Sequence, residues 1–276
     1  MDLWFTEKYA DHSGLTMQVR DVLYQGESEY QKLAILDTFT FGKVFLLDGA
    51  VMLTERDEFL YHEMLSHAPL FTHPDPKRVL VIGGGDGGTV REILKHEGVE
   101  EIVLVEIDAK VLEVCRKYLP SISSGLSEPR VTVLCEDGVR YVSKAPAGRF
   151  DVILVDSTDP VGPALALFSR EFLADCCRVL GDRGVFACQS GSPFFNLSLM
   201  TQIHAHAREI FPQAGFYLAP VMAYPGGTWS FLMGSKGSAP LPHCRQDVSF
   251  PTSYYTRQVH LASFALPRFL EEAIRA

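Results

Sequence analysis

Residues 79–88 read Val79–Leu80–Val81–Ile82–Gly83–Gly84–Gly85–Asp86–Gly87–Gly88. The apolar, β-branched run at 79–82 predicts a buried parallel strand, and the glycines after it predict a tight turn into a helix. The spacing Gly83-x-Gly85-x-x-Gly88 matches the nucleotide-binding fingerprint of a Rossmann-like unit, in which a ligand approaches the backbone closely. Asp86 inside this loop would repel a pyrophosphate, so the loop favours a cationic ligand over a dinucleotide.

Strands and helices alternate from residue 79 onward. Apolar runs predict strands at 79–82, 102–105, 131–134, 152–155 and 184–187, followed by helices near 87–96, 109–118, 138–144, 170–180 and 197–210. Two closing strands, near 215–221 and 228–234, flank a tight turn and should pair antiparallel. The pattern predicts an α/β fold with a doubly wound, mostly parallel sheet and an antiparallel edge.

The first part of the chain has a β pattern. Alternating runs at 17–24, 30–36 and 44–47, with an Asp48–Gly49 turn into 50–53, predict a small antiparallel sheet. A helix is expected from Glu58 to Leu70, ended by Pro69 and the breaker at 73–76. We therefore expect two domains, an N-terminal β-strand domain at 1–55 and a Rossmann-like catalytic domain at 56–276.

Composition narrows the class of protein. The chain has 276 residues, of which 47% are hydrophobic and 21% charged, as expected for a globular protein with a sizeable core. A net charge of −9 argues against nucleic acid as a partner and is compatible with a polycationic small molecule. The N-terminus lacks a signal-peptide pattern, and no apolar run reaches the ~18 residues of a membrane span. The six cysteines show no C-x-x-C spacing, which indicates free thiols and a cytoplasmic location.

Acidic residues follow four of the predicted parallel strands. Ligands of open α/β sheets bind outside the carboxyl ends of the strands, so these acids should converge on one crevice. A single acid after a strand is usually a helix cap or a solvated turn, but four such positions predict a functional site. The positions are Asp86, Glu106 with Asp108, Glu136–Asp137, and Asp156 with Asp159.

Each acid can be given a task. Glu106, about 20 residues beyond the glycine loop, is placed to accept hydrogen bonds from ribose hydroxyls. Asp137, with the backbone of Gly138, suits an adenine edge. These features indicate an adenosine, carried either by NAD or by an S-adenosyl ligand. Three acids (Asp86, Asp156 and Asp159) remain for the reacting end, where without a partner cation they would raise one another's pKa. They make a suitable socket for ammonium groups.

Metal binding is the rival use for such acids. Two or three carboxylates with His62 could hold Mg²⁺ or Mn²⁺. No phosphate-bearing partner for such an ion is indicated, and His62 and His67 lie roughly 140° apart around the predicted helix. The spacing does not resemble a zinc site, so we expect no metal.

Several sequence blocks, in the order in which they occur, closely resemble spermidine synthases, and the resemblance runs nearly end to end. The blocks are Glu55–Arg56–Asp57–Glu58–Phe59-x-Tyr61–His62–Glu63–Met64, Gly83–Gly88, Asp156–Ser157–Thr158–Asp159–Pro160–Val161–Gly162–Pro163, Tyr254–Tyr255 and His260–Pro267. The resemblance implies a fold of the S-adenosylmethionine-methyltransferase type. It implies transfer of an aminopropyl group from decarboxylated S-adenosylmethionine to putrescine, giving spermidine and methylthioadenosine. The donor would be a co-substrate, with no further cofactor.

The resemblance also implies roles for individual positions. Asp156 matches the proton acceptor. The resemblance implies that His62, Asp86 and Asp159 contact the polyamine. It implies that Tyr61, Gln189 and Tyr224 line the amine channel. Contacts to the thioadenosine moiety are implied for Gln31, Glu106, Asp137, Gly138 and Pro163. From the residues alone, Tyr61, Gln189 and Tyr224 could equally be ordinary packing.

One block departs from the family pattern. Where many members have Ile–Pro–Thr–Tyr–Pro, this chain has Val221–Met222–Ala223–Tyr224–Pro225, which bears on the positioning of the amine and on acceptor length. The alternatives are aminopropyl transfer to cadaverine, agmatine or spermidine, an N-methyltransferase on the same scaffold, and a catalytically silent adenosyl-binding protein. Asp86 would repel the carboxylate of intact S-adenosylmethionine, which favours the decarboxylated donor. A homodimer or homotetramer is expected from the apolar N-terminal strands and the resemblance.

Overall fold

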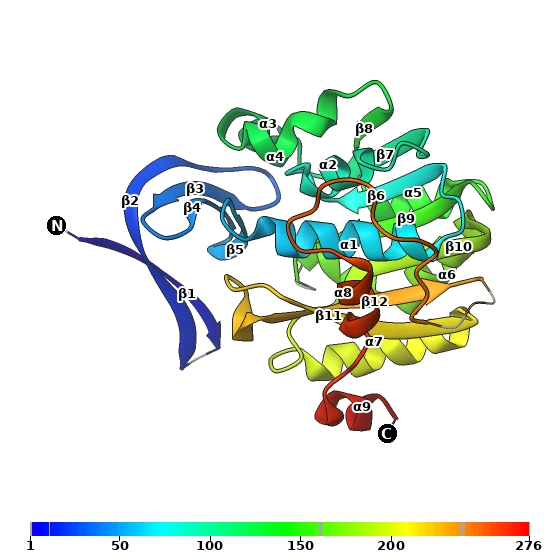
Figure 1. Cartoon of the computed structure of the whole chain (residues 1–276). Helices are drawn as coiled ribbons and strands as arrows, with labels where there is room; N and C mark the ends of the chain where they lie inside the picture. The colour runs from blue at the N-terminus through cyan, green and yellow to red at the C-terminus, as the bar shows by residue number, and fades with distance from the viewer. Residues whose placement is uncertain (1, 11, 160–161, 238, 240, 276) are drawn as a thin grey trace.

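The computed structural model describes residues 2–10, 12–159, 162–237, 239 and 241–275. Two sheets organise the chain (Figure 1): a small antiparallel sheet of five strands and a large sheet of seven. The small sheet has the order β1-β2-β3-β4-β5 and the large one β11-β12-β10-β9-β6-β7-β8. The predicted fold class, a Rossmann-like mostly parallel sheet preceded by an N-terminal β sheet, is therefore confirmed.

The large sheet is parallel at its centre. Its strands are β6 (Arg78–Gly83), β7 (Glu101–Glu106), β8 (Val131–Cys135), β9 (Phe150–Asp156) and β10 (Leu180–Gln189). The edge is antiparallel, with β11 (Gln213–Pro220) and β12 (Thr228–Ser235), as the sequence predicts. β6 has β7 on one side and β9 on the other, so the chain reverses direction across the sheet between β6 and β9. Such a reversal opens a crevice at the carboxyl ends of the two strands.

Helices cover both faces of this sheet, and alternate strand residues fill the two cores. On one face α1 (Glu58–Thr72) and α2 (Gly88–Leu94) pack over Val79 and Val81. On the other face Leu80 and Ile82 share a core with α6 (Arg170–Val179) and α7 (Leu197–Ile210), beside α5 (Gly138–Lys144). The continuous apolar run at 79–82 is thus explained by burial on both sides.

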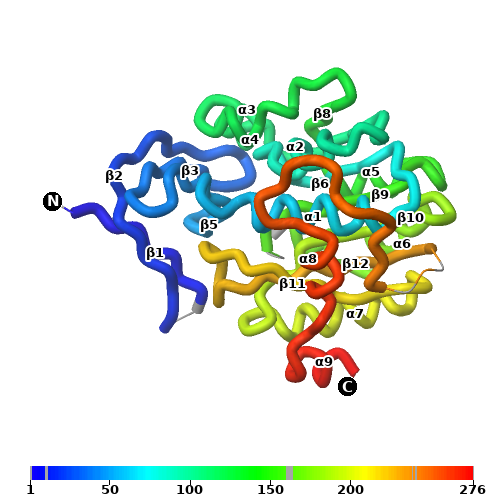
Figure 2. The backbone as a smooth tube through the Cα atoms, viewed as in Figure 1, coloured from blue at the N-terminus to red at the C-terminus, as the bar shows by residue number. Residues whose placement is uncertain are grey.

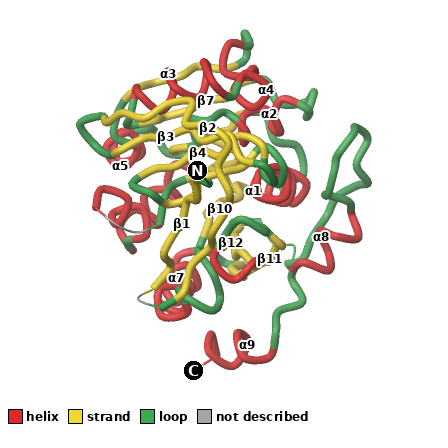
Figure 3. The backbone as a smooth tube through the Cα atoms, turned by 90° about the vertical axis from the view of Figure 1, so that its left-hand side faces the viewer, coloured by secondary structure: helices red, strands yellow, loops and turns green. Residues whose placement is uncertain are grey.

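The small sheet consists of β1 (Leu3–Ala10), β2 (Ser13–Glu27), β3 (Lys32–Thr38), β4 (Gly42–Leu47) and β5 (Ala50–Thr54). One of its faces packs against α3 (Ala109–Tyr118) and α4 (Pro120–Ser123), through residues such as Ile35 and Phe45. The β1–β2 hairpin extends away from the main body in Figure 1, and Figure 3 shows β2, β3 and β4 from the side that faces away from the large sheet.

The final segment returns across the large domain. Residues 241–256 run over α1 as an irregular strap, shown in orange in Figure 2. The Glu63 carboxylate of α1 accepts hydrogen bonds from the backbone N–H groups of Ser253, Tyr254 and Tyr255, at 2.7–2.8 Å. The chain then forms α8 (Arg257–Ser263) and α9 (Arg268–Arg275).

Several elements differ from the prediction. Helix α1 continues past Pro69 to Thr72 because a proline near the end of a helix removes a single N–H, and the Thr72 hydroxyl donates to the Ala68 carbonyl. Strand β1 and helices α4 and α8 were not predicted, since none of them has a clean apolar period. Three short 3₁₀ segments, η1 (Ser124–Ser127), η2 (Gly162–Phe168) and η3 (Pro225–Gly227), complete the described elements. Within the described residues, no helix has the length and apolar character needed to span a bilayer.

Candidate active site

The glycine loop and the end of β9 meet at the point where the sheet reverses. Gly83 pairs with Asp156 in the parallel ladder, and the Gly84 N–H donates to the Asp156 carbonyl at 2.8 Å. Gly84 has a φ of 66°, and a Cβ there would lie 2.8 Å from Asp156 Oδ2. Glycine is therefore required at this position by the left-handed backbone and by the proximity of the carboxylate.

Two hydroxyls hold the Asp156 carboxylate in place. The Tyr61 hydroxyl of α1 donates to Oδ1 at 2.8 Å, and the Thr89 hydroxyl of α2 donates to Oδ2 at 2.6 Å. Burial and the neighbouring Asp86 charge raise the pKa of Asp156 above its usual value, while His62, Thr89 and Tyr61 oppose the shift. Burial also raises the pKa of Asp159, with Gln189 opposing it. The Asp156 shift agrees with the expectation that clustered acids raise one another's pKa, whereas the Asp159 shift is caused by burial and not by a neighbouring acid.

Asp86 departs from that expectation. Burial alone would raise its pKa, but His62 and the Gly88 N–H outweigh burial and lower it. Asp86 Oδ1 lies 3.3 Å from His62 Nε2 and accepts from the Gly88 N–H at 2.7 Å. The sequence argument assumed that the acids have no partner cation, and that assumption is wrong because His62 supplies one.

The spacing of His62, Asp86 and Asp156 would also suit a metal ion. One ligand atom from each lies within 4.8 Å of the other two. The carboxylate oxygens are already engaged: both Asp156 oxygens accept hydroxyl protons, and Asp86 Oδ1 accepts from the Gly88 N–H. A metal would have to displace these hydrogen bonds, so the donor set fits a cationic amine better than an ion. That no metal is used stays a prediction.

A second group of acids lies on the other side of the glycine loop. Glu106, at the end of β7, accepts from the Gly85 N–H at 3.1 Å and from the Asp108 N–H at 2.9 Å. Burial raises the pKa of Glu106 to about 7 despite these hydrogen bonds. The Gln31 amide donates to Asp108 Oδ2 at 2.9 Å, so the residue reaches this region from the small sheet. Gln31 and Glu106 are thus brought together through Asp108.

Asp137 and Gly138 begin helix α5. The exposed Asp137 side chain caps the helix through Oδ1, which accepts from the N–H groups of Val139 and Arg140 at 2.8 and 3.1 Å. Both bonds use Oδ1, and among the described residues Oδ2 accepts no hydrogen bond. A Cβ at Gly138 would lie 2.4 Å from Ile82 Cγ2, which places the glycine against the end of β6. Pro163 falls in η2, and its side chain lies outside the described residues.

Aromatic rings form a wall beside Asp156. Tyr61 lies 5.8 Å from Tyr224 between ring centroids, and Tyr224 lies 4.7 Å from Trp229. The Tyr224 hydroxyl donates to the Met52 carbonyl of the small sheet, which joins the two parts of the molecule beside the acids. The Gln189 amide donates to the carbonyls of Ser157 and Thr158 at 3.3 and 3.1 Å, and its place in an amine channel stays a prediction. These hydrogen bonds fix the loop that carries Asp159.

Three residues near the acids were not found from the sequence. Glu7 on β1 is 7% exposed, has one buried oxygen without a hydrogen-bond partner among the described residues, and has a pKa raised to about 7 by burial, with Asp159 adding to the shift. Thr89 contacts Asp156, as described above. Asp57 accepts from the Ala223 N–H at 2.9 Å and so holds the 221–225 block. Only Asp57, inside the 55–64 block, carried a sequence signal.

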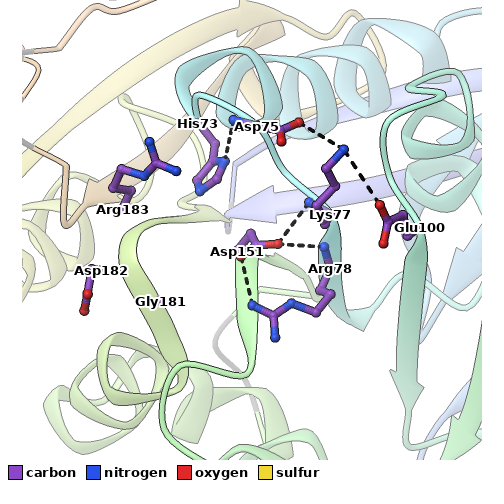
Figure 4. Close-up of a pocket in the computed structure, with 9 residues that line it drawn as sticks. All are labelled: His73, Asp75, Lys77, Arg78, Glu100, Asp151, Gly181, Asp182 and Arg183. Carbon is purple, nitrogen blue, oxygen red and sulfur yellow. Dashed lines mark hydrogen bonds and ion pairs between the residues drawn. The ribbon is translucent and has the colours of Figure 1, made fainter.

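A cavity of about 560 Å³ opens at the opposite edge of the sheet, at the amino ends of β6, β9 and β10 (Figure 4). Its charges neutralise one another: Lys77 lies 3.2 Å from Asp75, and Arg78 lies 3.2 Å from Asp151. It contains none of the residues predicted for the site. The carboxyl edge, where the acids gather, is therefore the candidate active site.

Comparison with known proteins gives the same family along the whole chain. A family model described as a spermine/spermidine synthase domain matches residues 58–242, and one described as a spermidine synthase tetramerisation domain matches residues 3–55. The polyamine aminopropyltransferase of Bacillus cytotoxicus is 46% identical over 276 residues, 100% of both chains. That of Bacillus subtilis is 46% identical over 277 residues, 99% of both chains.

Solved structures agree. A spermidine synthase in complex with the transition state analogue AdoDATO has a TM-score of 0.95 and 42% identity, covering 99% of this chain and 95% of that one. The spermidine synthase from Thermotoga maritima has a TM-score of 0.92 and 40% identity, and the match covers 99% of this chain and 94% of that one. The resemblance stated from the sequence is confirmed by these matches.

Proposed function

The chain belongs to the spermine/spermidine synthase family of aminopropyltransferases, and we propose that it converts putrescine and decarboxylated S-adenosylmethionine to spermidine and 5′-methylthioadenosine. The donor is consumed as a co-substrate, and the proposal includes no cofactor or metal. The observation that carries it is the half-buried cluster of acids at the carboxyl edge of the sheet, in which Asp156 is fixed by Tyr61 and Thr89 beside the glycine loop.

The thioadenosine part of the donor is assigned to the Glu106 side of the loop. The Glu106 carboxylate would accept hydrogen bonds from the ribose hydroxyls, and the Asp137 carboxylate would accept one from the adenine amino group, beside the backbone of Gly138. Gln31 completes this half through its contact with Asp108, and Pro163 is assigned to it by the family pattern. This division leaves Asp86 for the ammonium group of the donor.

The acids on the other side offset the repulsion between two cationic reactants. The donor carries a sulfonium and an ammonium, and putrescine is a dication. Two unit charges about 4 Å apart repel by roughly 4 kcal/mol at an effective dielectric constant of about 20. Asp86, Asp156 and Asp159 supply the opposite charges, and Tyr61 and Tyr224 give the alkyl chain an apolar wall.

Asp156 is proposed as the proton acceptor. The attacking amine must be neutral, and an amine with a pKa near 10 exceeds an ordinary aspartate by about six pKa units, or roughly 8 kcal/mol. Burial and Asp86 raise the pKa of Asp156, which narrows this gap. The nitrogen also becomes more acidic as its bond to carbon forms, so the proton moves late in the step. The sulfonium leaves readily, so the protein supplies alignment and deprotonation.

The far end of the acceptor is assigned to Asp159, with Glu7 close by. We assign the rim of this end to the block at 221–225, in which Met222 is exposed while Val221 and Ala223 are buried. Replacement of the usual proline and threonine by Met222 and Ala223 leaves the tyrosine in place but removes a ring and a hydroxyl. Cadaverine, agmatine and spermidine are therefore the alternative acceptors.

The small sheet is proposed to build a homodimer or homotetramer. The family model that matches residues 3–55 is described as a tetramerisation domain, and this range lies within the proposed N-terminal domain at 1–55. Leu3 and Trp4 on the edge strand β1 are 49% and 56% exposed, so they offer apolar surface for a partner subunit.

Product analysis tests the proposed reaction. The purified protein is incubated with decarboxylated S-adenosylmethionine and each amine separately, and the products are identified by mass spectrometry. We expect spermidine and methylthioadenosine from putrescine, with slower turnover of the other amines. Methyl transfer from intact S-adenosylmethionine, or faster turnover of another amine, would contradict the proposal.

A further inference from the structure

One buried carboxylate joins three elements of the fold beside the acids. Asp57, which directly precedes α1, is 5% exposed. Its Oδ1 accepts from the Thr54 hydroxyl at the end of β5, at 2.6 Å. Its Oδ2 accepts from the Ala223 N–H, between β11 and β12, at 2.9 Å. The side chain therefore connects the small sheet, the first helix of the large domain and the antiparallel edge.

The Asp57 side chain does not do what an aspartate at the start of a helix normally does. Such a residue usually caps its own helix by accepting from backbone N–H groups of the first turn. Asp108 and Asp137 cap α3 and α5 in this way. The Asp57 side chain forms no such bond, because both of its oxygens are directed to other elements. Its position indicates a task in the turn that contains Ala223.

That turn consists of residues 221–224, in which the Tyr224 N–H donates to the Val221 carbonyl at 3.1 Å. Ala223 is fully buried and packs in a core that it shares with the small sheet. Its N–H has no access to water, so it depends on Asp57 as its acceptor. Asp57 thus holds the middle of the turn to the start of α1.

The turn places Tyr224 against Tyr61. The two ring centroids lie 5.8 Å apart, and the Tyr61 hydroxyl donates to Asp156 Oδ1 at 2.8 Å. Tyr61 lies on α1, four residues or about one helical turn after Asp57. The helix that holds Asp156 through Tyr61 therefore also holds, through Asp57, the turn that carries Tyr224.

We propose that Asp57 is a positioning residue for the acceptor amine. By holding the 221–224 turn to α1, it fixes the Tyr224 ring relative to Asp156 and so sets where the alkyl chain of the amine lies. It acts through its hydrogen bonds and not through its charge, and it does not touch the amine. This inference rests on the proposed function, because it takes Asp156 as the proton acceptor and Tyr224 as part of the amine wall.

Asp57→Ala and Asp57→Asn together test the proposal. Putrescine is titrated by calorimetry into protein saturated with methylthioadenosine, which measures binding without turnover. Alanine leaves the Ala223 N–H without an acceptor, so we expect the dissociation constant of putrescine to rise by about tenfold as the wall moves. The asparagine oxygen can accept from Ala223 while its amide donates to the Thr54 hydroxyl, so the constant should stay within about threefold.

Two further readouts separate positioning from a general loss of stability. The affinity for methylthioadenosine should be unchanged in both variants, and the kcat/KM ratio of putrescine to cadaverine should fall only in Asp57→Ala. Asp151→Ala is the matched control, since this aspartate also accepts from backbone N–H groups, those of Lys77 and Arg78 at 2.9 Å, but at the amino edge of the sheet. We expect it to lower the melting temperature and leave putrescine binding unchanged.

The possible outcomes distinguish this inference from the proposed reaction. An unchanged dissociation constant in a folded Asp57→Ala would overturn the inference, as would an Asp57→Asn as impaired as the alanine variant or an equal loss in Asp151→Ala. Thr54→Val, which frees the Asp57 carboxylate to move, takes the place of Asp57→Ala if that variant does not fold, with an expected rise of about threefold. A parent protein that does not bind putrescine would overturn the proposed function and this inference with it.

Discussion

Asp156→Asn should lower kcat by about a thousandfold while the affinity for methylthioadenosine stays nearly unchanged. General bases contribute typically 10²–10⁴-fold, and the amide cannot take the proton of the attacking amine. The amide oxygen can still accept from Tyr61, and the Thr89 hydroxyl can turn to accept from the amide, so the fold should survive. The residues assigned to the thioadenosine part, such as Glu106, lie on the other side of the glycine loop and should be left intact.

The dependence of kcat/KM on pH is a second test of Asp156 as the base. As the proposed proton acceptor, Asp156 must be ionised, and burial and Asp86 raise its pKa, so kcat/KM of the parent protein should fall as the pH falls through that raised pKa. The Asn variant should lack this dependence. Steady-state rates across pH, with methylthioadenosine binding by calorimetry as the control, check both points. Near-normal turnover in Asp156→Asn would refute the assignment of the base.

Asp86→Asn should raise the KM for decarboxylated S-adenosylmethionine by about a hundredfold, equivalent to roughly 2.7 kcal/mol. A hydrogen bond between charged groups contributes about 1.5–3 kcal/mol, and the change also leaves His62 beside a neutral amide. The preference over intact S-adenosylmethionine should narrow, since the aspartate no longer repels the carboxylate of the intact compound.

Competition experiments measure this preference directly. Intact and decarboxylated S-adenosylmethionine each displace labelled methylthioadenosine from the parent protein and from Asp86→Asn, and the ratio of their dissociation constants is compared. Methylthioadenosine lacks the ammonium group, so its own affinity controls for misfolding. An unchanged ratio would show that Asp86 does not select the donor.

The fold could be predicted because its signals are local. Buried parallel strands appear as apolar runs such as 79–82, and the turn at Asp48–Gly49 marks a hairpin, so most elements were predicted within a few residues. Strand β1 was missed because its exposed edge and its charged residues hide the alternation. Helix α1 runs past Pro69 because one lost hydrogen bond does not outweigh its buried packing.

The site was predictable only in part, for a different physical reason. Acids at strand ends could be found because a parallel sheet brings its carboxyl ends together. The cation that partners Asp86 could not be found in this way. The charge of His62 depends on two carboxylates, Glu58 one helical turn away and Asp86 in the glycine loop. Glu7 reaches the crevice from β1, and only the packing of the two sheets shows its proximity to Asp159.

The central claim is that a buried negative crevice holds two cationic reactants with the attacking amine against Asp156. A crystal structure with putrescine and methylthioadenosine bound tests this most directly. We predict one amine nitrogen within about 3 Å of an Asp156 oxygen and the other beside Asp159. Putrescine bound away from both aspartates, or a metal ion held by His62, Asp86 and Asp156, would contradict the account.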